Sequence, residues 1–239
     1  MKHMKNFISV IVILFSTSCV INTNSDSIRG SGNIVADARQ VSNFSKVIVN
    51  VSGQMTIEQG ASESLTLEAD DNIVSLIDTY VTNGKLMIES VANISPSKQM
   101  KFSLKIKNLN YIKSTGSMRI QIDELKSEKI VIKTTGSGNV NIDKIEADHL
   151  EVNTTGSADT IMAAGSLKSQ LLVISGSGDI DTSNIESKDS NVLISGSGNI
   201  RLKADRSLKV NINGSGNVYY KGSPAISSRM SGSGSVNRF

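Results

Sequence analysis

Residues 130–142 read IVIKTTGSGNVNI, and this stretch decides the fold of the chain. Every second residue from Ile130 to Ile142 is apolar, glycine or threonine, whereas the residues between, such as Lys133 and Asn141, are mostly polar. A period of two is the side-chain alternation of a β-strand, in which one set of positions faces a core. The stretch therefore predicts strand on both sides of Gly-Ser-Gly, with the two glycines on the inward set.

The Gly-Ser-Gly motif recurs through the second half of the chain at a nearly constant interval. Its successive first glycines, from Gly116 to Gly232, are 20, 20, 20, 20, 18 and 18 residues apart. We expect these glycines to lie at tight bends, where no side chain fits or where φ is positive. The repeat glycines are Gly116, Gly136, Gly138, Gly156, Gly176, Gly178, Gly196, Gly198, Gly214, Gly216, Gly232 and Gly234.

This period is too short for a βαβ unit and contains no helical segment. The simplest solution is a solenoid, in which each period forms one coil and successive coils stack through parallel strands. Columns of Ile, Val and Leu would then form a thin continuous core, which fits a composition of five Phe, four Tyr and no Trp in 239 residues. We therefore expect an all-β fold, a single-stranded parallel β-helix with about 20 residues per coil.

The first half of the chain is less regular. Gly53 begins a weaker copy of the pattern, in which Met55 is interpreted as replacing the second glycine. Asn83-Gly84 lies between two strand-like runs and predicts a hairpin. We therefore expect one β-helix over 28–239, with irregular coils and a hairpin over 28–110 and regular Gly-Ser-Gly repeats over 111–239.

The N-terminus has the pattern of an export signal. A positively charged start precedes an apolar run over 7–15, about half the roughly 20 residues that a membrane-spanning helix needs. Small residues then lead to Cys19, the only cysteine, as in a bacterial lipobox. We expect a lipoprotein signal peptide over 1–18, lipidation of Cys19 and a polar tether over 19–27. The alternative is ordinary cleavage near Ser18, with the cysteine incidental.

Stacked coils would align the outward residues of the motif in columns of hydroxyl and amide side chains. Such a face could engage a glycan or a protein, or, less in keeping with the sequence, ordered water such as ice. Alternatively, the hydroxyls only satisfy neighbouring coils and keep the face soluble. The candidate ligand-facing residues are Thr135, Thr155, Ser137, Ser157, Ser177, Ser197, Asn139, Asp159, Asp179 and Asn199.

The stacked Asp159 and Asp179 raise the question of calcium, which accepts carboxylate oxygens. We favour a hydrogen-bonded Asn/Asp ladder and expect no metal site and no cofactor. His149 is the only histidine outside the expected signal, and we expect it to be a solvated surface residue. Neither a catalytic triad nor a Cys/His metal site can be assembled from this composition, so we expect no enzyme activity. A β-helix enzyme that processes polysaccharides remains an alternative.

Charge argues against nucleic-acid binding. Removal of Lys2 and Lys5 with the expected signal leaves 23 Lys and Arg against 22 Asp and Glu, so no clustered basic footprint is indicated. The open ends of a solenoid expose unpaired strand edges. We expect the last coil to be covered by its own tail, Val236 to Phe239, or by a partner, which includes a second copy of the chain.

Several segments in combination resemble a known family. These are Gly30-Ser31-Gly32-Asn33-Ile34, Phe44 to Val47, and residues 51–60 and 65–73, followed by the serial repeats. Together they resemble the putative auto-transporter adhesin, head GIN domain family over residues 28–239. The resemblance implies a right-handed β-helix in a lipid-anchored envelope protein of the outer membrane, on its periplasmic or surface side. It transfers no ligand or catalytic residue, and a periplasmic assembly or signalling partner is the other alternative.

Overall fold

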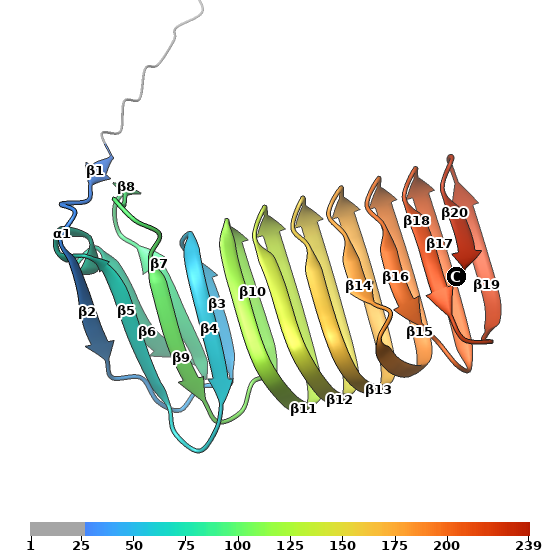
Figure 1. Ribbon diagram of the computed structural model, residues 1–239, viewed down its shortest axis with the longest axis horizontal. Helices are drawn as coiled ribbons and strands as arrows, with labels where there is room; N and C mark the ends of the chain where they lie inside the picture. The colour runs from blue at the N-terminus through green and yellow to red at the C-terminus, as the bar shows by residue number, and fades with distance from the viewer. Residues whose placement is uncertain (1–26) are drawn as a thin grey trace, which may run out of the picture.

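The computed structural model describes residues 27–239 as a stack of β-coils along one long axis (Figure 1). Eighteen strands belong to one continuous sheet that winds around a thin interior. The described part contains a single short helix. No helix in this part of the chain is both long and apolar enough to cross a membrane. The expected signal peptide and Cys19 lie outside the described residues, as does all but the end of the tether.

The second half forms the regular part of the stack. Its strands pair in parallel, and equivalent positions of successive motifs lie opposite one another, as Gly136 does with Gly116 and with Gly156. The predicted β-solenoid with a period of about 20 residues is therefore confirmed. Its strands are β10 (Tyr111–Gly116), β11 (Met118–Gly136), β12 (Asn139–Gly156), β13 (Thr160–Gly176), β14 (Ile180–Thr182), β15 (Ile185–Gly196), β16 (Ile200–Lys203), β17 (Ser207–Gly214), β18 (Asn217–Lys221), β19 (Ala225–Ser231) and β20 (Ser235–Arg238).

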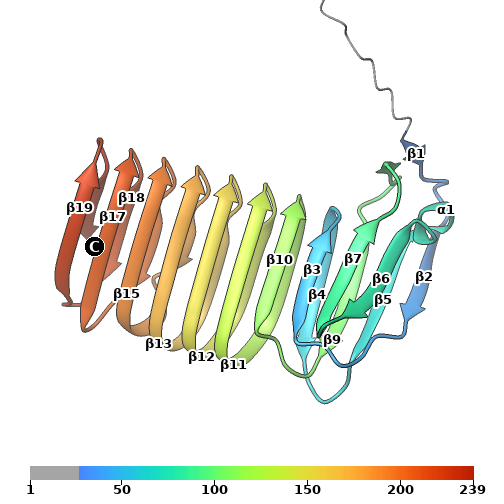
Figure 2. The same ribbon diagram turned by 180° about the vertical axis from the view of Figure 1, so that it is seen from behind.

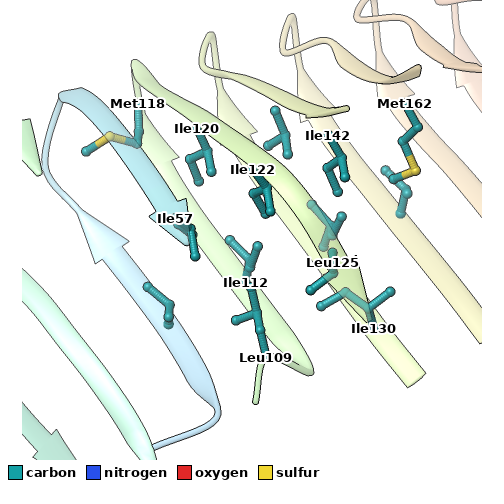
Figure 3. Close-up of a cluster of buried hydrophobic side chains, with 14 of the residues drawn as sticks. Ile57, Leu109, Ile112, Met118, Ile120, Ile122, Leu125, Ile130, Ile142 and Met162 are labelled. Carbon is teal, nitrogen blue, oxygen red and sulfur yellow. The ribbon is translucent and has the colours of Figure 1, made fainter. Parts of the chain in front are cut away.

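Like residues stack on like residues inside the coils. Figure 3 shows Ile120, Ile122 and Ile142 among the buried side chains that fill the interior. Full burial of each such side chain stabilises the fold by roughly 1.5–3 kcal/mol. One column runs almost the length of the stack and is buried throughout; it contains Leu86, Val47, Ile112, Ile132, Val152, Leu172, Val192 and Val210.

One column contains a buried hydroxyl that makes no hydrogen bond. Thr160 lies between Val140 and Ile180, and its Oγ1 is the only buried side-chain oxygen or nitrogen without a partner in residues 27–239. An unsatisfied buried polar group costs about 1–3 kcal/mol. We therefore expect Thr160→Val to stabilise the chain by about 1 kcal/mol in urea unfolding.

Thr182→Val is the matched control for this substitution. The Thr182 hydroxyl is also buried, but it donates a hydrogen bond of 2.9 Å to Gln170 Oε1. Its loss leaves the amide oxygen of Gln170 without that donor, and we expect a destabilisation of about 1 kcal/mol. Equal effects of the two substitutions would contradict the assignment of the Thr160 hydroxyl as unsatisfied.

The first half is folded in a spatial order that differs from its order in sequence. β3 lies between β7 and β10, and β4 lies between β9 and β11, so the β3–β4 coil is inserted between two later segments (Figures 1 and 2). The elements of this half are β1 (Ile28–Arg29), β2 (Ile34–Arg39), β3 (Lys46–Asn50), β4 (Gly53–Gln59), β5 (Ser64–Asp70), α1 (Asp71–Val74), β6 (Ile77–Thr82), β7 (Lys85–Ser90), β8 (Ile94–Ser95) and β9 (Lys101–Ile106).

The register of this inserted coil corrects one expectation. Gly53 pairs with Met118 and Met55 pairs with Ile120, so Gly53 occupies the column of second glycines and Met55 occupies an apolar column. The interpretation of Met55 as a glycine replacement was wrong because this coil lacks the first glycine of the motif. The predicted hairpin is confirmed, since β6 and β7 pair antiparallel around Asn83 and Gly84, which have φ of 50° and 70°.

The N-terminal end of the core is closed by polar side chains. Arg39 on β2 reaches across to α1 and β6, where its guanidinium donates to the carbonyl oxygens of Val74 (2.8 Å) and Ile77 (3.1 Å). The same guanidinium forms an ion pair with Asp37. Inward-pointing charges of this kind discourage the pairing of an edge strand with another chain.

Asp70 holds the N-terminal segment against this end. Its buried carboxylate accepts hydrogen bonds from the backbone nitrogens of Gly32 (2.7 Å) and Ser97 (2.9 Å) and from the Ser97 hydroxyl. These bonds, the Ser97 hydroxyl first, lower the pKa of Asp70 below its ordinary value of 3.8. A lowered folded-state pKa stabilises the fold above the ordinary value, and this contribution is lost as the pH falls through the folded-state pKa.

We therefore expect Asp70→Asn to lower the urea midpoint at pH 7, and to lower it progressively less as the pH falls below 3.8 and through the lowered folded-state pKa, where the wild-type carboxylate also becomes protonated. Urea titrations of both chains at pH 7 and at a series of lower pH values measure the difference. A loss of midpoint that is the same at every pH would contradict a role for the ionised carboxylate.

The C-terminal end is open along β19. The tail forms β20, which pairs with β18 and completes the last coil, while Phe239 packs edge-on against Tyr219 at a ring distance of 6.4 Å. β19 pairs only with β17 among the described strands, and all seven of its residues are exposed. The expectation that the tail covers the end of the last coil was therefore wrong, because those residues are used to build that coil.

Candidate binding face

The Gly-Ser-Gly motifs form one corner of each coil, and the backbone of the preceding coil requires the glycines there. Gly136 has a φ of 116°, and a Cβ on it would lie 2.5 Å from the carbonyl oxygen of Gly116. A Cβ on Gly138 would lie 2.2 Å from the carbonyl oxygen of Met118. The obstacle is thus the neighbouring coil along the stack as well as the bend itself, and the glycines let the coils approach closely at this corner.

The serine at the centre of each motif points outward, including in the coils where one of the flanking glycines is replaced. Register places Ser117 beside both Ser137 and Ser52, so the column begins one coil earlier than the motif predicts. Ser52 was missed because its coil lacks the first glycine. The exposed serine column is Ser52, Ser117, Ser137, Ser157, Ser177, Ser197, Ser215 and Ser233.

A second exposed column of hydroxyl residues runs beside the serines. It contains Thr115, Thr135, Thr155, Ser175 and Ser195, which precede the first glycine of their motifs. Within residues 27–239, the hydroxyls of these residues and of Ser137, Ser157, Ser177 and Ser197 form no hydrogen bond with protein. The hydroxyls therefore do not tie neighbouring coils together, and they remain available to solvent or to a ligand. We call the two columns together the hydroxyl face.

The Asn/Asp column has a different role, as the ladder interpretation predicts. Asp159 Oδ1 accepts the backbone N–H of Asp179 (2.9 Å), and Asp179 Oδ1 accepts the backbone N–H of Asn199 (2.7 Å). Asn139 and Asn199 begin and extend the same half-buried ladder with bonds of 3.4 Å and 3.3 Å to the next coil. These oxygens are committed to the backbone, and residues 27–239 contain no group of three or more His, Cys, Asp or Glu side chains placed to hold a metal.

A hollow of about 510 Å³ lies where the serine column begins. Ser52 and Ser117 line one side, and the segment between β7 and β9 lines the other with both polar and apolar residues. Lys98 is the only charged residue of its lining. The hydroxyl face therefore continues into a concave, nearly neutral site that could receive the end of a ligand lying along the column.

His149 contacts a serine on the next coil but no carboxylate among the described residues. Its Nδ1 lies 2.7 Å from Ser169 Oγ on the next coil, but no carboxylate in the described chain hydrogen-bonds to the ring. Asp189, two coils along in the same column, pairs instead with Arg206 and accepts from the Ser207 hydroxyl at 2.7 Å. Arg206 and then Ser207 lower the pKa of Asp189 to about 2, so this carboxylate is ionised and a poor proton donor at neutral pH.

The fold and the face define this protein as a β-solenoid with an uncharged hydroxyl surface. Comparison with known proteins identifies its family. The family model described as "Putative auto-transporter adhesin, head GIN domain" matches residues 43–224. The chain belongs to this family. No curated protein matches it in sequence.

Solved structures with the same fold cover nearly the whole chain. A crystal structure of a putative adhesin from Bacteroides fragilis is 26% identical, covers 89% of this chain and 100% of its own, and has a TM-score of 0.85. A putative adhesin from Parabacteroides merdae is 20% identical, with coverage of 90% and 99% and a TM-score of 0.78. A putative lipid binding protein from Parabacteroides distasonis is 24% identical, with coverage of 89% and 99% and a TM-score of 0.76.

Proposed function

We propose that this protein is a non-catalytic, adhesin-like binding module of the cell envelope. Membership of an adhesin-head family and the adhesin designation of the Bacteroides fragilis structure support a binding role. The export-type pattern over 1–18 and the single Cys19 support anchoring through lipid in the outer membrane. The described solenoid begins directly after the short polar tether, so the anchor would hold its N-terminal end near the membrane.

The observation that carries the proposal is the hydroxyl face. Its hydroxyls repeat at the spacing of stacked parallel strands, about 4.8 Å, and apart from Ser52, which accepts the Ser117 N–H, they have no hydrogen-bond partner among the described residues. A regular, rigid and uncharged array of donors and acceptors suits a neutral ligand that itself carries many hydroxyl groups, which is the chemistry of a glycan. The backbone-bonded Asn/Asp ladder beside it keeps the corners in place, so little ordering is needed on binding.

The test is a glycan and matrix-protein binding array with the purified chain carrying Cys19→Ser, which keeps it unacylated. We expect binding to neutral glycans, and we expect Ser157→Tyr combined with Ser177→Tyr to abolish it by covering the centre of the hydroxyl face. Thr56→Tyr combined with Ser103→Tyr is the matched control, because these exposed residues also lie side by side on neighbouring strands, β4 and β9.

Binding that survives the serine pair but is lost in the control pair would contradict the assignment of the face. The absence of any bound glycan or protein on the array would contradict the binding function itself.

A further inference from the structure

Each end of the solenoid terminates in two strands that have only one neighbouring strand. At the N-terminal end, β6 pairs only with β7 and β2 pairs only with β5 among the described strands. At the C-terminal end, β19 and β20 likewise have one neighbour each, β17 and β18. Through the chain of pairings, β6 and β19 terminate one side of the coil stack, and β2 and β20 terminate the other. Each end therefore offers two free strand edges, and Figures 1 and 2 show them at opposite extremes of the molecule.

At the C-terminal end, the last apolar residues of the core columns are exposed to solvent. Ile226 stacks on Leu208 and Met230 stacks on Ile212, so both occupy inward positions. Ile226 is 45% exposed and Met230 is 49% exposed, whereas Leu208 and Ile212 are each 1% exposed. Apolar core positions beside a free strand edge are what a further coil would cover.

The two ends carry opposite charge. Residues 206–239 contain five Lys and Arg and no Asp or Glu, whereas residues 28–97 contain eight Asp and Glu against four Lys and Arg. Arg229 projects outward from β19 and forms no ion pair with any described residue. Asp78 projects outward from β6, is exposed and forms no ion pair there either. These residues lie on the edge strands that terminate the same side of the stack.

We infer that the C-terminal end of one chain docks on the N-terminal end of a second copy, so that the solenoid continues head to tail. β19 then pairs with β6 and β20 with β2, the exposed Ile226 and Met230 are covered, and Arg229 lies near Asp78. The like charges of two C-terminal ends oppose the alternative of an end-to-end dimer with twofold symmetry. A heterologous contact of this kind does not close on itself, so it produces rods of increasing length.

Opposite charges on the two ends make the association dependent on salt. Electrostatic attraction between exposed charges acts over a Debye length of about 10 Å at 0.1 M ionic strength and about 3 Å at 1 M. The outer edges of β2 and β6 have no partner strand in the described chain, but Arg39 already occupies the Ile77 carbonyl of β6 and pairs with Asp37. This polar closure of the N-terminal end makes the contact weaker than a continuous core. We therefore expect a reversible association that is seen at high protein concentration and low salt.

Sedimentation velocity of the full chain carrying Cys19→Ser, measured over a concentration series at low and high salt, tests the inference. We expect species larger than a monomer that grow with concentration and dissociate in high salt. Arg229→Glu and Asp78→Lys should each weaken the association by about tenfold or more, because each places like charges at the contact. Arg119→Glu is the matched control, since Arg119 is an exposed, unpaired residue in the middle of the stack.

Charge reversal on both sides of the proposed contact distinguishes it from other contacts. The chain carrying both Arg229→Glu and Asp78→Lys should associate again, and so should an equimolar mixture of the two single variants. A chain that remains monomeric throughout the series overturns the inference and leaves the open end to a different partner. So does a dimer that Asp78→Lys does not weaken, because that result indicates contact between two C-terminal ends.

Discussion

Replacement of Gly196 by alanine is expected to destabilise the chain by about 3 kcal/mol or more, because two costs coincide at this position. Its φ of 134° is a backbone conformation that residues with a Cβ rarely adopt. A Cβ built there would also lie 2.2 Å from the carbonyl oxygen of Gly176 on the preceding coil. Relief of that overlap requires the two coils to separate, which breaks the pairing between β13 and β15 near this corner.

Ser197→Ala is the control for this prediction. Ser197 is the next residue, is exposed and makes no side-chain hydrogen bond within the described chain, so its loss should change the free energy of unfolding by less than about 0.5 kcal/mol. Urea unfolding followed by circular dichroism measures both variants. A Gly196→Ala chain as stable as the Ser197→Ala chain would show that the coils are not packed this closely.

Truncation of Ile132 to alanine is expected to cost about 3–4 kcal/mol, within the range for a large aliphatic residue removed from a core. Ile132 is fully buried and lies between Ile112 and Val152 in the long apolar column. The coils above and below are fixed by their own hydrogen bonds, so the interior can relax only partly into the space left by the side chain.

Val131→Ala gives the comparison on the same strand. Val131 points outward and is only partly buried, so its truncation should cost less than about 1 kcal/mol. Thermal and urea unfolding of both variants measure the difference. Similar losses at the two positions would mean that the alternation along β11 does not divide core from surface.

The regular half of the fold could be predicted from sequence because each coil packs against a near copy of itself. Alternation over residues 130–142 defines the inward set of one coil, and the interval between motifs places the next coil upon it. Gly136 and Gly156 therefore pair as the repeat predicts. The Asn/Asp ladder follows from the same stacking, since it needs only that Asp159 and Asp179 occupy equivalent positions.

The order of the first half could not be predicted in this way. β3 pairs with β10, which begins 65 residues after it, and no local pattern identifies that neighbour. Closure of the N-terminal end by Arg39 also depends on a contact between β2 and the distant β6, so the sequence around Arg39 alone does not reveal it.

The candidate site could likewise be predicted only in part. The serine and threonine columns follow from the repeat, so their exposed positions could be predicted. Ser52 was the exception, because its coil lacks the first glycine of the motif. The hollow at the start of the column could not, because its second wall is the segment between β7 and β9, whose place depends on the inserted coil. Likewise, the alternation assigns Ile226 and Met230 to the inward set. Their exposure could not be predicted, because it depends on β19 having no further neighbour among the described strands.

Stacking of residues one period apart is the central claim, and a cysteine cross-link tests it most directly. In a Cys19→Ser chain, Ser137→Cys with Ser157→Cys places the cysteines on adjacent coils about 4.8 Å apart, within the range of a disulfide, whereas Ser137→Cys with Ser177→Cys places them about twice as far apart, beyond it. Mass spectrometry of the oxidised monomers should detect an internal disulfide in the first chain and free thiols in the second. Free thiols in the first chain, or equal cross-linking in both, would contradict the stacked solenoid.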